Sequence, residues 1–105
     1  MTPIRSYKDL IAWQQSMELV VACYRLTEGF PSSERYGLAS QLQRAAVSVP
    51  ANIAEGHSRR TRGAYINHLS IAYGSLAELE THILIAGRLK YVAPGHEATC
   101  LQQLE

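Results

Sequence analysis

The stretch TRGAYINHLSIAYGSLAELETHILIAGRLK, Thr61 to Lys90, decides the fold class of this chain. Its apolar side chains alternate steps of four and three over three heptads, which is the spacing of one face of a helix that turns about 100° per residue. This face consists of Tyr65, Leu69, Ala72, Leu76, Leu79, Ile83 and Ala86. Thr61 is the expected N-cap, and Arg88 and Lys90 stand where cations offset the helix dipole. The pattern predicts a helix over residues 61–90.

Two helices are predicted upstream of this stretch. In the first helix, apolar residues recur at steps of three and four and form one face: Leu10, Trp13, Met17, Val20 and Tyr24. It predicts a helix over residues 8–28, ended by a left-handed turn at Gly29 and by Pro31. In the second helix, the apolar residues stay on one helical face on both sides of Pro50: Leu38, Leu42, Ala45, Val49 and Ile53. It predicts a single kinked helix over 33–55, capped by Ser32 or Ser33 and ended by a left-handed turn at Gly56.

Pro94 can open a fourth helix over residues 94–104, carrying Leu101 and Leu104. The expected fold class is therefore all-α: one domain, residues 1–105, forming an antiparallel up-down four-helix bundle with a kinked second helix and a short fourth helix. The fourth helix would be about 16 Å long and the third about 43 Å. One end of the long helices is then poorly covered, which predicts self-association or a truncated C-terminus, and self-association is favoured.

Composition limits the classes of function. The chain has 105 residues, a formal net charge of +1 and 18% charged residues, so any nucleic-acid surface must be local. No stretch approaches the roughly 18 apolar residues of a membrane span. Cys23 and Cys100 lack metal-type spacing and are expected to be reduced thiols. We expect a cytoplasmic protein with no membrane partner.

No arrangement of residues predicts catalysis. His68 and His82 stand about 21 Å apart along the third helix, too far to share a metal ion. A Gly-x-Ser-x-Gly elbow and a phosphate-binding loop are both missing from the sequence. We therefore expect no enzyme activity, no catalytic residues, no metal and no cofactor.

A polar stripe follows the second helix at steps of four, four and three: Arg44, Ser48, Asn52 and Glu55. On the third helix, Ser75 and Glu78 flank the heptad core at its middle and can meet Arg44 and Asn52 if the two helices pack antiparallel. Because unpaired polar groups are costly inside a bundle, these residues predict a structural polar network that sets the helix register.

The segment HSRRTR, residues 57–62, connects the second and third helices. Its arginines, Arg59, Arg60 and Arg62, are called the basic corner below. They either cap the carbonyl groups of the preceding helix as solvated cations or present positive charge to phosphate groups. Thr61 and the amides that follow open the third helix, whose positive end would strengthen an anion site.

Several segments, in this order and at these separations, resemble the 23S rRNA intervening-sequence protein family. They are YKDLIAWQQSMELV, FPSSERYGLASQLQRAAVSVPANIAEG and GSLAELETHILIA, which span nearly the whole chain. The resemblance implies a helical bundle whose members can assemble as five-subunit rings. It also implies a relation to the accessory variability protein of diversity-generating retroelements, which forms such a ring and engages a reverse transcriptase and nucleic acid.

The expected function is therefore a homo-oligomeric interaction module, with a five-subunit ring favoured by the resemblance, that binds RNA or DNA through the basic corner. The alternative is a purely protein-binding accessory subunit, for example of a reverse transcriptase or an RNA-processing complex. A small enzyme that acts on RNA ranks below both.

Overall fold

The computed structural model describes residues 3–93 and Gly95. In this part of the chain it contains three α-helices, α1 (Ile11–Thr27), α2 (Leu38–Ser58) and α3 (Arg62–Arg88). Short 3-10 helices precede α1 and α2, namely η1 (Tyr7–Asp9) and η2 (Ser32–Glu34). The described residues hold no strand, which confirms the all-α class.

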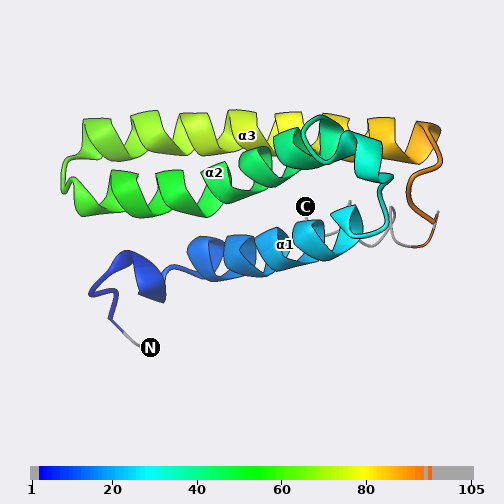
Figure 1. Cartoon of the computed structure of the whole chain (residues 1–105). Helices are drawn as coiled ribbons and strands as arrows, with labels where there is room; N and C mark the ends of the chain where they lie inside the picture. Colours follow the sequence, from blue (N-terminus) through cyan, green and yellow to red (C-terminus); the bar gives the residue numbers. More distant parts are fainter. Residues whose placement is uncertain (1–2, 94, 96–105) are drawn as a thin grey trace.

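Consecutive helices run antiparallel, and α2 lies between α1 and α3 (Figure 1). Both outer helices pack against α2, whereas no Cα atom of α1 lies within 8 Å of one in α3. The predicted fourth helix, residues 94–104, lies outside the described residues except for Gly95. A four-helix bundle therefore stays a prediction.

The first helix begins later than the predicted residue 8. Leu10 has an extended backbone with ψ of 126°, so α1 starts only at Ile11. A capping box closes η1 separately: Ser6 Oγ accepts from the Lys8 amide, and Asp9 accepts from the Ser6 amide. The left-handed turn expected at Gly29 is also absent. The amides of Gly29 and Phe30 instead bond back to Leu26 and Thr27, at 3.3 and 3.0 Å.

The second helix begins later than predicted. Ser32 lies in η2, and α2 starts at Leu38, whose amide donates to Glu34 Oε1 at 3.2 Å. The N-cap residue is Gly37, and the first amide of the helix is bonded by a glutamate side chain instead of by Ser32 or Ser33. α2 continues without interruption through Pro50, and its ribbon changes direction along its length in Figure 1.

The second helix also ends later than predicted, at Ser58. Gly56 lies inside α2 and is buried, and the predicted left-handed turn there is wrong. A Cβ atom added to Gly56 would lie 2.6 Å from the Cβ of His68 on α3. Glycine is therefore required at this position by the close approach of two helices rather than by a turn.

The core forms where the three helices meet. Its largest fully buried side chains are Leu42, Leu79, Ile83 and Cys23. Small residues of α2, Ala45 and Ala46, pack in the same cluster and keep the helices close. A second cluster of Val49, Ile53 and Ala72 lies nearer the α2–α3 connection, with Trp13 packed against it. Among the helices of the described residues, none combines the length and the apolar character that crossing a membrane requires.

Replacing Gly56 with Ala tests the close contact between α2 and α3. Alanine normally stabilises a helix interior relative to glycine by about 1 kcal/mol. Here the added methyl would overlap the base of the His68 side chain, which cannot rotate away, so we expect a net loss of about 1–3 kcal/mol. Chemical denaturation measures the difference.

Gly74→Ala is the matched control, because a Cβ added at Gly74 in α3 meets nothing within 4 Å. This variant should be more stable than the natural protein by about 0.5–1 kcal/mol. Equal stabilisation by both substitutions would contradict the role given to Gly56.

Candidate functional site

The connection between α2 and α3 holds the three arginines of the basic corner. Arg59 is the C-cap residue after α2 and keeps right-handed helical dihedrals, and Arg60 follows with φ of 60° in the left-handed region. Thr61 then caps α3 as predicted, since its Oγ1 accepts from the Ala64 amide at 3.2 Å. The chain therefore reverses at Arg60, and Arg62 is the first residue of α3.

The N-terminal segment is held in place by one carboxylate. Asp9 Oδ2 accepts hydrogen bonds from the backbone amides of Arg5 and Ser6, at 2.8 and 3.1 Å. These two amides hold the pKa of Asp9 below its ordinary value, since they stabilise the charged carboxylate. The backbone of Arg5 is thereby tied to η1, which packs against α2.

This segment and the end of α2 line a pocket of about 360 Å³, here called the junction pocket. Its lining consists of Arg5, Ser6, Tyr7, His57, Ser58 and Arg60. The proximity of Arg5 to Arg60 was not predictable from the sequence, because it depends on contacts between distant parts of the chain. His57 is local, since the Arg60 amide bonds to its carbonyl at 3.3 Å, but no pattern singled out its side chain. The capping pattern from Ser6 to Asp9 was the available signal that this segment is ordered.

The arginines at this end differ in their charge partners. Arg59 pairs with Glu55 at 2.8 Å, and this hydrogen bond is the largest cause of the lowered pKa of Glu55. Arg5, Arg60 and Arg62 are exposed and form no ion pair with another described residue. Arg60 and Arg62 of the basic corner, together with Arg5, therefore carry positive charges that no described acidic side chain neutralises.

The start of α3 adds to this positive character. The first amides of an α-helix lack partners within the helix, and its dipole places partial positive charge at that end. In this protein the first amides of α3 are those of Arg62 and Gly63, which follow Arg59 and Arg60 in the chain. The arrangement suits an anion such as a phosphate group.

A chain of hydrogen bonds joins α2 to α3 behind this corner. The hydroxyls of Ser48 and Ser75 lie 2.8 Å apart, and Asn52 Nδ2 donates to the carbonyl and the hydroxyl of Ser48 at 2.8 and 3.0 Å. Asn52 Oδ1 lies 3.0 Å from His68 Nδ1. Because an amide oxygen only accepts, His68 Nδ1 carries the proton in this contact.

The other residues of the expected polar network are placed differently. Arg44 and Glu78 are exposed and line a shallow hollow of about 300 Å³ with Ser48 and Ser75, but they form no ion pair with each other. Glu78 Oε1 instead lies 3.3 Å from Nε2 of His82, one turn further along α3. Asn52 contacts His68 rather than Ser75 or Glu78, a partner that the spacing of the polar stripe did not predict.

Metal chemistry has no support in the part of the chain that the structure describes. No group of three or more histidine, cysteine, aspartate or glutamate side chains there is placed to hold an ion. Cys23 is buried in the core. The expectation that the protein is not an enzyme stays a prediction.

A comparison with known protein families finds a match over nearly the whole chain. The model of the family described as 23S rRNA-intervening sequence protein matches residues 8–105, which is nearly the whole chain. No curated protein matches the chain. The match covers all three α-helices and the basic corner, whereas Arg5 and Ser6 lie before it.

Removing the Asn52 amide should weaken the link between α2 and α3. Asn52→Ala leaves His68 and Ser48 without their shared partner in a half-buried site, so we expect a loss of about 1–2 kcal/mol in the free energy of unfolding. Asn67→Ala, at an exposed position of α3, is the control and should be neutral or slightly stabilising. Equal stability of the two variants would show that the hydrogen-bond chain contributes nothing.

Proposed function

The chain belongs to the 23S rRNA-intervening sequence protein family, and from this premise we propose that it is a non-enzymatic helical module that binds nucleic acid through its basic corner. The observation that supports the proposal is the uncompensated charge at the α2–α3 connection. Arg60 and Arg62 are exposed without an ion pair among the described residues, and Arg5 lines the junction pocket together with Arg60. Arginine suits this task, because its planar group grips phosphate in a bidentate way and stacks on unpaired bases.

A single subunit would bind weakly. Three arginines neutralise about three phosphates, which gives a slope of log affinity against log salt of about −2.7 on duplex DNA. The formal net charge of +1 adds little long-range attraction. Useful affinity therefore requires that several copies of the corner meet one nucleic acid.

Self-association would supply these copies. Ile66 and Tyr73 stand one heptad apart on α3 and are 54% and 78% exposed, and Met17 and Val21 are exposed on α1. Apolar surface of this kind commonly marks a protein interface. We propose a closed homo-oligomer, with five subunits favoured by the family resemblance, in which every subunit presents its corner on one rim.

The same exposed apolar side chains favour a second candidate function. In this alternative the protein is a purely protein-binding accessory subunit, for example of a reverse transcriptase or an RNA-processing complex. A relation to the accessory variability protein of diversity-generating retroelements would favour the reverse transcriptase. The two candidates differ in whether the arginines of the corner contribute to binding.

Light scattering tests self-association. The natural protein should show the mass of a closed oligomer at tens of micromolar, and Ile66→Lys/Tyr73→Lys should lower that mass because two charges would enter the interface. Gln41→Lys/Ala51→Lys, at exposed positions of α2 without a large apolar side chain, is the control and should keep the oligomer. A monomer mass for the natural protein would rule out the assembly.

Titration of duplex DNA and structured RNA at two salt concentrations tests the basic corner. Arg60→Ala/Arg62→Ala should lose at least tenfold in affinity and show a shallower salt dependence. Arg59→Ala should lose less, because Arg59 is already paired with Glu55. Arg25→Ala/Arg88→Ala removes two exposed arginines elsewhere and is the charge-matched control. Equal binding by all of these proteins, or none by the natural one at low salt, would favour the protein-binding alternative.

A further inference from the structure

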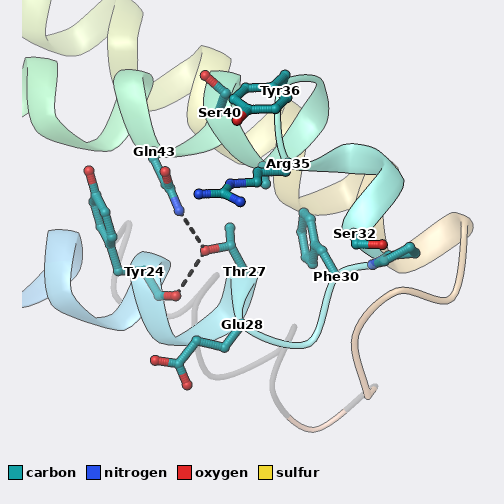
Figure 2. Close-up of a pocket in the computed structure, with 11 residues that line it drawn as sticks. Tyr24, Thr27, Glu28, Phe30, Ser32, Arg35, Tyr36, Ser40 and Gln43 are labelled. Atoms are coloured by element: carbon teal, nitrogen blue, oxygen red, sulfur yellow. Dashed lines mark hydrogen bonds between the residues drawn. The ribbon is translucent and has the colours of Figure 1, made fainter.

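A second pocket lies at the other end of α2 from the basic corner (Figure 2). It has a volume of about 530 Å³ and is formed by the end of α1, the α1–α2 connection and the first turns of α2. We call it the connection pocket. Its volume falls within the range of small-molecule sites in proteins.

A guanidinium group points into the connection pocket. Figure 2 shows Arg35 directed toward the space between Gln43 and Thr27, whereas the carboxylate of Glu28 points away from it. Arg35 has no ion pair with another described residue. The neighbouring acid, Glu34, is otherwise engaged: it accepts from the Tyr91 hydroxyl at 2.9 Å and from the amide that starts α2. The charge of Arg35 is therefore available to an anionic ligand.

Flat aromatic faces stand at the rim. Tyr36 is 87% exposed, and the guanidinium carbon of Arg35 lies 5.5 Å from the centre of its ring. Tyr24 on α1 also lines the pocket and is exposed. A tyrosine ring left open to solvent beside an arginine is a platform on which a planar ligand can stack.

The floor offers a hydrogen-bonding edge of fixed orientation. Gln43 Nε2 donates one hydrogen bond to Thr27 Oγ1 at 2.9 Å, and that hydroxyl donates to the carbonyl of Tyr24 at 2.8 Å. Because these bonds set the orientation of the Gln43 amide, its carbonyl oxygen and second N–H remain for a ligand. An adjacent acceptor and donor on one amide match the donor and acceptor edge of a nucleobase, adenine above all.

We infer that the connection pocket binds one unstacked nucleotide, with the base on Tyr36, the base edge against Gln43 and the phosphate at Arg35. If the nucleotide belongs to a single strand of nucleic acid, the inference rests on the proposed function of nucleic-acid binding and adds a second contact to it. It does not depend on the basic corner, because Gln43 and Ser58, the last residue of α2 before that corner, are separated by about 22 Å along the helix. A free nucleotide carries the same chemistry and is the other source of ligand.

The test titrates the full-length protein, labelled for NMR, with the four nucleoside monophosphates and separately with a single-stranded hexanucleotide. Shifts should gather on Tyr24, Thr27 and the side-chain amide of Gln43. Tyr36→Ala and Arg35→Gln should each weaken binding about tenfold. Tyr36 and Arg35 are exposed, so both variants should fold, and Tyr73→Ala is the control for loss of an exposed tyrosine.

The arms of the experiment separate the two sources and the two sites. Binding of monophosphates at the pocket identifies a free nucleotide as sufficient, and binding of the hexanucleotide alone identifies a strand. Arg60→Ala/Arg62→Ala should leave the shifts that monophosphates cause at the connection pocket unchanged, so a failure of the basic corner would be seen without loss of this inference. Absence of pocket shifts with both probes, or equal affinity of Tyr36→Ala and the natural protein, would overturn the inference and leave the pocket to a protein partner.

Discussion

The close approach of α2 to α3 is the constraint on which the rest of this structure depends. Gly56 has no side chain, so the Cβ of His68 can lie only 2.6 Å from the point where any other residue would place its own Cβ atom. At this separation the hydroxyls of Ser48 and Ser75 bond directly, and Asn52 reaches His68. Since these polar groups are half-buried or buried, their pairing also disfavours a shifted register of the two helices.

The central place of α2 follows from its composition. Small residues on its buried face let α1 and α3 pack against it, while larger side chains from all three helices fill the core. The junction pocket and the connection pocket lie at opposite ends of α2. Arg60 lies at the junction pocket after its last turn, and Gln43 lies at the connection pocket in its first turns. Both candidate sites are therefore supported by the best-packed element of the described structure.

Helix boundaries and cap residues show where local patterns were insufficient. The capping function of Thr61 was predictable, because a threonine side chain bonds within its own turn. Gly29 and Gly56 were each predicted to end a helix with a left-handed turn, and both predictions are wrong. Gly29 lies in a turn without positive φ, where its amide donates to the carbonyl of Leu26. Gly56 serves a contact between helices, and the residue with positive φ after α2 is Arg60. The tolerance of glycine for positive φ can be read from the residue type itself, whereas a tight contact depends on what lies opposite.

The sequence by itself determined that the chain is helical, where its long apolar faces lie, and that arginines gather between the second and third helices, because periodicity and composition are local properties. The pairing of Glu55 with Arg59 is also local, because the two residues stand one helical turn apart. Tertiary structure decided that Arg5 joins Arg60 at the junction pocket. It also assembled the connection pocket from Arg35, Tyr36 and Gln43. These outcomes depend on how α1, α2 and the segments that join them pack in space, and no spacing along the chain specifies that packing.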